Sequence, residues 1–146
     1  MFQGQIRPLN VLLVEDNPGD VRLMREALRD GGAAKNLNAV ENGEEAIAYL
    51  RRESPFADVP KPDLIFLDLN LPKKDGREVL DEIKGDNNLR RIPVVVLTTS
   101  EAERDVCRAY DLHANCYVKK PSDLDEYMEV IRACENFWLR IVRLPR

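Results

Sequence analysis

Three short apolar runs without polar alternation constrain the fold of this chain most strongly. They occupy residues 11–14, 64–67 and 94–97. A strand with one face in water alternates polar and apolar residues, so these runs are expected to be buried on both faces. Strands of that kind form parallel sheets that helices cover on both sides. The runs therefore predict an α/β fold built on a parallel sheet.

Amphipathic stretches alternate with these runs and predict the helices. Apolar residues recur at helical spacing in residues 18–30, 43–52, 76–84 and 101–111, and a last helix is expected from residue 123, with Ser122 as its N-cap. Gly31 and Gly32 end the first helix, and weaker strand patterns lie at residues 37–40 and 116–118. Five βα units in this order predict a doubly wound, five-stranded parallel sheet.

The composition limits the class of protein. The 146 residues are 44% hydrophobic and 33% charged, which predicts one globular domain with an apolar core. No window approaches the roughly 18 apolar residues of a membrane span, and residues 1–10 do not resemble a signal peptide. The net charge of −4, without a basic tract, argues against nucleic-acid binding. Cysteines without close pairing indicate reduced thiols in a cytoplasmic protein.

Polar side chains follow four of the predicted strands. Glu15 and Asp16 come after the first run, Asp68 after the third strand, Thr98 after the fourth, and Lys120 shortly after the fifth. Each has an ordinary explanation when taken alone, as a helix-start acid, a turn residue or a solvated charge. The carboxyl ends of parallel strands meet at one edge of the sheet, where such folds bind ligands. Together these residues predict a functional site at that edge.

The residue types indicate the chemistry of this site. Carboxylates that converge at one edge repel each other, and a cation among them removes that cost. Hard oxygen ligands with open positions suit Mg²⁺, which also takes up phosphate oxygens. Lys120 offers a positive charge for a phosphate, and Thr98 offers a hydroxyl donor. An ionised Asp68 beside a metal can attack a phosphoryl donor and form an acyl phosphate.

Four segments of the chain resemble the response-regulator receiver family in order and spacing. They are VLLVEDN, PDLIFLDLNLPKKDG, PVVVLTTS and CYVKKP, and the resemblance covers roughly residues 8–136. It implies a flavodoxin-like fold with strand order 2-1-3-4-5 and Asp68 as the phosphoacceptor. It also implies that Asp16 and Asp68 bind Mg²⁺ together with the backbone carbonyl of Asn70. Glu15 stands where Asp is more usual in the family, which leaves open whether its side chain reaches the metal directly or through water.

The resemblance also assigns roles around the phosphoryl group. Thr98 and Lys120 would hold it, and Tyr117 lies at the family's switch aromatic position, although plain core packing is the alternative for this ring. The Lys120–Pro121 bond lies at the position of the family's cis peptide. The loop at residues 54–61 looks longer than in minimal receivers.

These features predict a two-component response regulator, not an enzyme, which accepts a phosphoryl group on Asp68 from a histidine kinase. No output domain is expected, so the signal would pass through protein contacts. A pseudo-receiver that takes no phosphate is one alternative, but Asp16, Asp68, Thr98 and Lys120 are all present. A phosphatase with an Asp nucleophile is another, and it needs a second Asp where this chain has Asn70.

The C-terminal segment ENFWLRIVRLP resembles the extension of single-domain regulators that partner phytochrome-type histidine kinases. Beyond the receiver core, residues 137–146 form this extension. Across the last helix and this extension, apolar residues recur at a seam-like spacing of four and three, and they predict a homodimer: Tyr127, Ile131, Cys134, Trp138 and Ile141. The alternative is that the tail folds back on its own domain.

Overall fold

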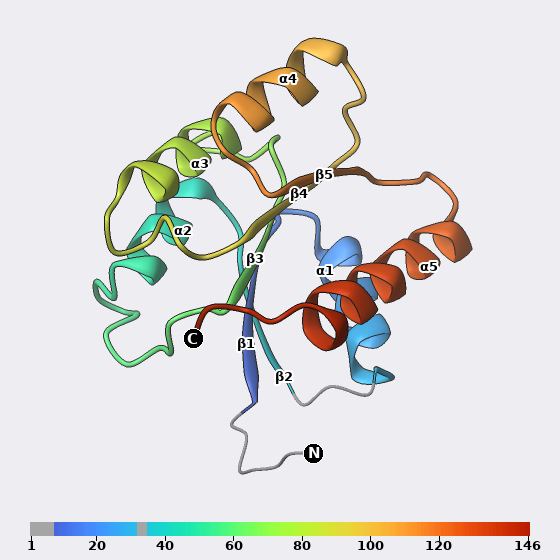
Figure 1. The fold of residues 1–146 in the computed structure, drawn as a ribbon, viewed down its shortest axis with the longest axis horizontal. Coiled ribbons are helices and arrows are strands. Elements are labelled where there is room, and N and C mark those ends of the chain that lie inside the picture. The colour runs from blue at the N-terminus through green and yellow to red at the C-terminus, as the bar shows by residue number, and fades with distance from the viewer. Residues whose placement is uncertain (1–7, 32–34) are drawn as a thin grey trace.

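The computed structural model describes residues 8–31 and 35–146, in which strands and helices alternate along the chain (Figure 1). A short π-helix, η1, continues the last α-helix. The elements are β1 (Leu9–Val14), α1 (Pro18–Arg29), β2 (Lys35–Val40), α2 (Gly43–Leu50), β3 (Leu64–Leu67), α3 (Gly76–Gly85), β4 (Val94–Thr98), α4 (Glu103–Asp111), β5 (Cys116–Lys119), α5 (Leu124–Glu135) and η1 (Asn136–Ile141).

The strands form one parallel sheet in the order β2-β1-β3-β4-β5. In β3, Leu64 pairs with Val11 and Leu67 with Val14, so the two central strands end level with each other. Helices α1 and α5 cover one face of the sheet, and α2, α3 and α4 cover the other (Figure 1). The predicted doubly wound, flavodoxin-like fold with strand order 2-1-3-4-5 is confirmed.

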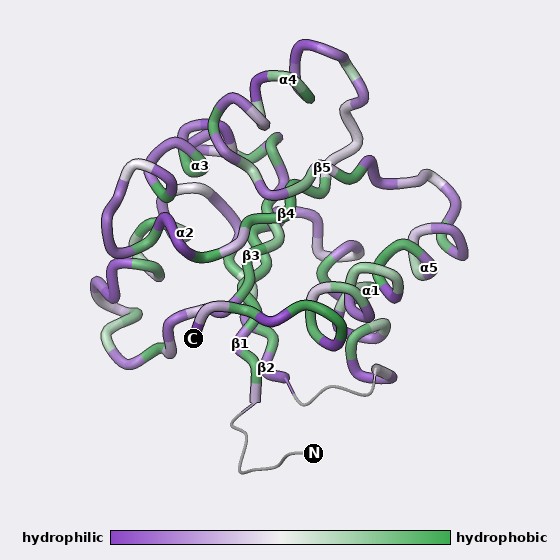
Figure 2. Tube along the Cα trace, viewed as in Figure 1, coloured by the Kyte–Doolittle hydropathy of each residue, from purple (hydrophilic) through white to green (hydrophobic). Residues whose placement is uncertain are grey.

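Two apolar cores lie on the two faces of the sheet, because successive strand residues point to opposite sides. Leu12 and Val14 pack under α2 and α3, whereas Val11 and Leu13 pack under α1 and α5. Every residue of β3 is buried, which explains its lack of polar alternation. Figure 2 shows hydrophobic strands in the interior and hydrophilic outer sides on the helices. In the part of the chain that the structure describes, no helix has the length and apolarity needed to cross a membrane.

The C-terminal tail folds back on its own domain, as the alternative interpretation predicted. Leu139 and Leu144 are buried in the same core as Tyr127 and Ile131. The tail then crosses toward the loop before β3 (Figure 1), where the Arg146 guanidinium lies 3.5 Å from the Asp63 carboxylate. Part of the predicted dimer seam is therefore used inside the chain. Phe137 and Ile141 stay exposed on the surface.

The N-cap of α5 is Asp123, so the prediction of Ser122 is wrong. The Asp123 carboxylate accepts hydrogen bonds from the backbone N–H groups of Asp125 (2.8 Å) and Glu126 (3.4 Å). Either side chain can accept from the free N–H groups at the start of a helix, but a carboxylate also interacts favourably with the helix dipole because it carries a negative charge.

The Lys120–Pro121 peptide bond is trans, so the expected cis bond is also wrong, and the cis peptide among the described residues is Ser54–Pro55. The two isomers of a bond before proline differ little in free energy, so the surroundings decide between them. Helix α1 ends at Arg29, and Gly31 donates its N–H to the Leu28 carbonyl. Gly32 and most of the segment tested for a signal peptide lie outside the described residues.

Candidate functional site

Backbone hydrogen bonds continue past the strand ends and place the predicted site residues at one edge of the sheet. Glu15 donates its N–H to the last carbonyl of β2 (3.0 Å), and Asp68 donates to the last carbonyl of β1 (3.1 Å). Lys120 donates to the carbonyl of Thr98, the last residue of β4, at 2.7 Å. The side chains thus project from the edge that sequence reasoning predicted for them.

The start of α1 turns back over this edge. Asn17 caps the helix and accepts hydrogen bonds from the N–H groups of Gly19 (2.9 Å) and Asp20 (3.1 Å), with Pro18 at the first helical position. The Asn17 N–H itself donates to the Glu15 carboxylate at 3.2 Å. This turn holds Glu15 inward and brings Asp20 to the site.

Lys120 is the centre of the site. Its ammonium donates to the Glu15 carboxylate, to Asp20 Oδ2 at 2.9 Å and to Asp68 Oδ2 at 3.0 Å. The side chains of Lys120 and Glu15 are only 5% and 2% exposed, so this pair lies away from water. Asp20 was missed by sequence reasoning. An acid in the first turn of the helix that follows Asp16 was the available signal.

Burial and neighbouring charges shift the pKa values of these groups in opposite directions. Burial raises the pKa of Glu15 to about 7, although the hydrogen bond and the charge of Lys120 oppose this rise. Burial also disfavours a charged Lys120, but the carboxylates of Glu15, Asp68 and Asp20 outweigh it and raise the pKa of the ammonium. Three acids thus contact one cation at this edge, with Asp16 beside two of them, and the excess of negative charge favours a second cation.

Glu15, Asp16 and Asp68 together can hold a metal ion. Each offers one carboxylate oxygen, and these oxygens lie within 4.8 Å of one another. Asp16 is exposed, whereas the other two acids are buried, so the set opens to solvent on one side. Hard oxygen donors with an open side match the needs of a divalent ion that keeps part of its water shell. The donor set therefore fits the predicted metal.

Asn70 shapes the loop that follows β3. Its backbone N–H donates to Asp68 Oδ1 at 3.1 Å, and its side-chain amide lies 3.5 Å from the hydroxyl of Thr98. Thr98 is fully buried. These contacts connect the end of β4 to Asp68 through Asn70. The role of the Asn70 carbonyl as a metal ligand remains a prediction.

Tyr117 is tied to a different part of the edge. Its hydroxyl donates to the Ser100 carbonyl at 2.8 Å, and the ring is half-buried on β5. The structure therefore joins Tyr117 to the loop after β4, and not to the carboxylates around Lys120.

A network that the sequence did not reveal holds α4 to α3. The Asp105 carboxylate accepts from the Ser100 hydroxyl at 2.6 Å and lies 2.9 Å from the Arg77 guanidinium. Arg77 also pairs with Asp75, the N-cap of α3. The hydrogen bonds from Ser100 and Arg77 lower the pKa of Asp105. Because Ala109 is the only residue of α4 that is buried, these polar contacts account for much of its attachment.

The sequence profile of the response regulator receiver domain matches residues 11–132. Response regulator Rcp1 of Synechocystis sp. is 48% identical over 138 residues, which cover 94% of each chain.

Two solved structures share this fold closely. The phosphorylated cyanobacterial phytochrome response regulator RcpA has a TM-score of 0.93 and 50% identity, and the match covers 96% of this chain and all of that one. The Mn²⁺-bound form of Rcp1 has a TM-score of 0.93 and 47% identity, with coverage of 95% and 100%.

Proposed function

The chain belongs to the response-regulator receiver family, and on that premise we propose that Asp68 accepts a phosphoryl group from a histidine kinase. One observation carries the proposal. The buried ammonium of Lys120 lies 3.0 Å from an Asp68 oxygen at the carboxyl edge of the sheet, among acids that fit a metal. Nucleophile, phosphate-binding cation and metal ligands thus lie within reach of a single phosphoryl group.

The transfer uses few groups. One Asp68 oxygen forms a bond to phosphorus while the bond from phosphorus to the histidine nitrogen of the kinase breaks. The electron pair of the broken bond stays on that nitrogen. Lys120 then donates to a phosphoryl oxygen in place of the Asp68 carboxylate, and the Thr98 hydroxyl donates to a second one. Positioning and charge stabilisation account for most of the rate in such transfers.

We propose Mg²⁺ as the cofactor, held by Asp16, Asp68 and the Asn70 carbonyl, with Glu15 on the same ion directly or through water. When bound, the ion supplies positive charge to the phosphoryl oxygens. The Mn²⁺-bound structure of Rcp1, 47% identical, supports a divalent ion in this family. Glu15 is tied to Lys120 and to the Asn17 N–H, which favours contact through water.

The first prediction concerns the metal. The wild-type protein, incubated with acetyl phosphate and Mg²⁺, should gain the mass of one phosphoryl group. Excess chelator should prevent this gain, and Asp16→Asn should slow it by about tenfold or more, because Mg²⁺ takes few protein ligands. Intact-mass spectrometry against time measures both effects. Asp58→Asn, an exposed acid away from the site, is the matched control and should behave as wild type. Labelling at full rate in chelator would rule out the metal.

We propose that phosphorylation is transmitted through Thr98 and Tyr117. A phosphoryl group on Asp68 draws the Thr98 hydroxyl away from Asn70, and the loop after β4 moves with it. Tyr117 and Asp105 both bond to Ser100 in that loop, so α4 and the surface of β5 respond together. Contacts made only in the phosphorylated form bias a two-state element in this way.

The second prediction tests this route. Thr98→Ala should still be phosphorylated, but its partner binding should respond to phosphorylation much less than wild type does. Thr99→Ala is the control, because that neighbouring side chain is exposed. Binding of the kinase to each protein, with and without the phosphoryl group, is measured by calorimetry. A response of wild-type size in Thr98→Ala would refute the route.

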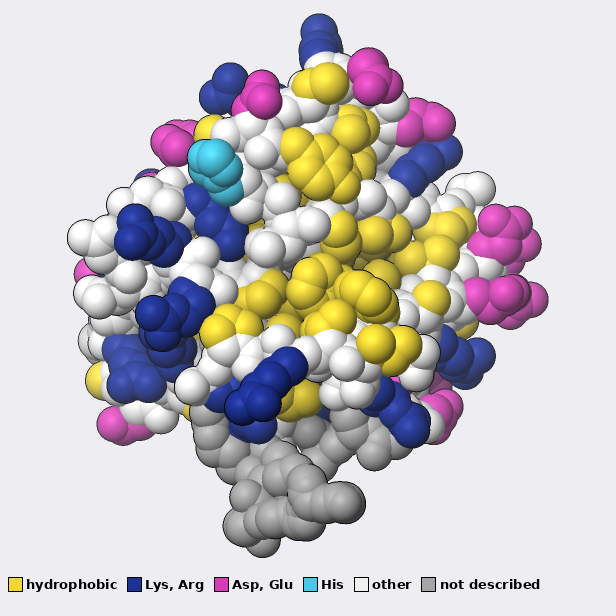
Figure 3. Space-filling view, viewed as in Figure 1, with side chains coloured by type: hydrophobic (Ala, Val, Ile, Leu, Met, Phe, Trp, Pro, Cys, Tyr) yellow, Lys and Arg dark blue, Asp and Glu magenta, His cyan; other side chains and the backbone are white. Residues whose placement is uncertain are grey.

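We propose a phytochrome-type histidine kinase as the partner, in the cytoplasm, on the strength of the likeness to RcpA and Rcp1. We further propose that residues 8–136 form the receiver core and 137–146 an extension that supports a homodimer. Figure 3 shows hydrophobic side chains gathered over β5 and the tail. Two residues of η1 are among the exposed apolar side chains, Ile141 at 65% and Phe137 at 48%. Exposed apolar groups of this kind mark protein interfaces, and a two-fold dimer is the commonest way to bury them.

The third prediction concerns this dimer. Leu139 and Leu144 are buried in the chain's own core, so point changes at exposed residues test the interface better than a truncation. Ile141→Glu should convert a dimer to a monomer, measured by light scattering at micromolar concentration, with little change in stability. Leu124→Glu, at the other end of α5 and 67% exposed, should leave the dimer intact. A wild-type protein that is monomeric with and without phosphate would contradict the homodimer.

A further inference from the structure

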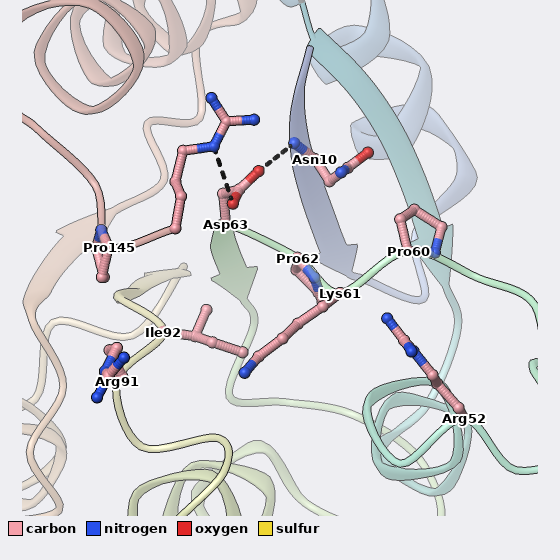
Figure 4. A pocket seen from close by; sticks show the side chains of 10 residues that line it. Asn10, Arg52, Pro60, Lys61, Pro62, Asp63, Arg91, Ile92 and Pro145 are labelled. Carbon is pink, nitrogen blue, oxygen red and sulfur yellow. Dashed lines mark hydrogen bonds and ion pairs between the residues drawn. The ribbon is translucent and has the colours of Figure 1, made fainter. Parts of the chain in front are cut away.

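A pocket of about 320 Å³ lies at the opposite edge of the sheet from Asp68. We call it the basal pocket, and its walls include Arg52, Lys61, Asp63, Arg91, Ile92 and Arg146. It is formed by the loops that lead into β3 and β4 and by the end of the tail (Figure 4). Asp63 precedes β3 and Asp68 follows it, so roughly 16 Å of strand separates the two sites.

The basal pocket is strongly cationic although the protein is acidic overall. Four basic side chains and one carboxylate line it. Asp63 accepts from the Asn10 N–H at 2.8 Å and lies 3.5 Å from the Arg146 guanidinium, so its charge is already engaged (Figure 4). Lys61 donates to a neutral carbonyl, that of Asn88, at 3.0 Å.

Arg52 and Arg91 lie on either side of Lys61 in Figure 4, and both are exposed. No ion pair with a carboxylate is found for either of them within residues 8–31 and 35–146. Arg52, Arg91 and Lys61 thus bring three positive charges to one hollow, and in the part of the chain that the structure describes none of the three forms an ion pair with a carboxylate. Three prolines and the buried Ile92 complete its walls with apolar surface.

The backbone of Arg52 adds a second, independent observation. Arg52 follows α2 with φ of 55°, a left-handed conformation in which its N–H donates to the Tyr49 carbonyl. Glycine is the usual residue at this place after a helix, because a side chain there is strained. The chain thus places a guanidinium at the pocket where a glycine would stabilise the fold more. Such strain is concentrated at functional sites.

We propose that the basal pocket binds a small phosphorylated organic molecule, of the size of a nucleoside monophosphate. Guanidinium groups match the oxygens of a phosphate, and a dianionic phosphate balances the charge better than a single carboxylate does. The volume lies at the small end of ligand pockets and leaves room for one organic group against the prolines and Ile92. This site is separate from Asp68 and does not depend on phosphoryl transfer.

The proposal is tested by titrating the full chain with AMP, inorganic phosphate and adenosine, in chelator so that no metal links a phosphate to the acidic edge. Binding is followed by calorimetry and by amide chemical shifts. AMP should bind saturably, and more tightly than inorganic phosphate or adenosine. Arg52→Gln and Arg91→Gln should each weaken AMP binding by about tenfold, since each removes a charge-assisted hydrogen bond.

Two controls separate this site from others. Arg22→Gln, an exposed arginine on α1, should leave AMP binding unchanged, and so should Asp68→Asn. Failure of the proposed phosphotransfer would therefore leave this result untouched. The proposal is overturned if AMP shows no saturable binding, if inorganic phosphate binds as tightly as AMP, or if either arginine variant binds as wild type does.

Arg52→Gly offers a test in the opposite direction. It relieves the left-handed strain, so the midpoint temperature of unfolding should rise, while AMP binding should fall by about tenfold or more. A stabilised variant that keeps full AMP affinity would show that Arg52 serves only as a helix end, and the proposal would then be wrong.

Discussion

The Asp68→Asn variant is expected to gain no phosphoryl mass under conditions that label the wild-type protein completely. An amide oxygen is a far weaker nucleophile than a carboxylate, so the covalent step is lost. Asparagine has nearly the same shape, and the backbone bond from residue 68 to β1 does not depend on the side chain. The fold should therefore survive, as the far-ultraviolet circular dichroism spectrum can check.

Neighbouring acids should not take over the role of Asp68. Glu15 is 2% exposed and bonded to Lys120, and Asp20 accepts from the same ammonium at 2.9 Å. Asp16 is open to solvent and forms no ion pair with a basic side chain among the described residues. Asp81→Asn, an exposed acid on α3, is the matched control and should be labelled at the wild-type rate. Undiminished labelling of Asp68→Asn would show that Asp68 is not the phosphoacceptor.

Much of the fold follows from local patterns in the sequence. Residues 64–67 are apolar without alternation because both faces of β3 are covered, and 0% of each side chain is exposed. Once five βα units are recognised, the parallel sheet follows from the length of the crossovers. The strand order is not encoded locally, and it was predicted only through the resemblance to a family. The cap of α5 was misplaced by one residue, because Ser122 and Asp123 are both good caps and only the backbone geometry separates them.

The candidate site was predictable as a set of residues but not as a network. Parallel strands bring their carboxyl ends together, so Glu15, Asp68, Thr98 and Lys120 could be grouped from sequence alone. Lys120 and Asp20 are 100 positions apart in the sequence. Their pairing depends on the direction in which α1 leaves β1, and no local sequence pattern predicts it. The contact of Arg77 with Asp105 joins two different helices, so no local sequence pattern predicts it either.

Lys120→Met is expected to destabilise the metal-free protein by about 3–5 kcal/mol, since it leaves buried carboxylates without a counter-charge. Methionine keeps most of the volume of the side chain, so the loss reflects charge more than packing. Divalent metal should then stabilise the variant more than the wild type, because a cation takes the place of the ammonium among the acids. Unfolding by urea, in chelator and in Mg²⁺, measures the four free energies.

The matched control for Lys120→Met is the same change at the neighbouring residue, Lys119. Lys119 pairs with Glu101 at 2.7 Å, but both side chains are at least half exposed. Water and salt screen such a pair, so Lys119→Met should change the free energy of unfolding by no more than about 0.5 kcal/mol. An equal loss of unfolding free energy in Lys119→Met and Lys120→Met would mean that the buried network stabilises the fold no more than an exposed ion pair does.

The loss of unfolding free energy in Lys120→Met should also increase as pH rises. Burial already raises the pKa of Glu15 from 4.5 to about 7 in the folded protein, and removing Lys120 takes away the hydrogen bond and the charge that chiefly oppose this rise. A carboxyl whose folded pKa is raised favours the folded state below its unfolded pKa, and this contribution is lost as pH increases through the folded value. The deficit of the variant should therefore be small at about pH 5 and grow through neutral pH. A deficit that shrinks as pH rises would contradict the placement of unpaired, buried acids around Lys120.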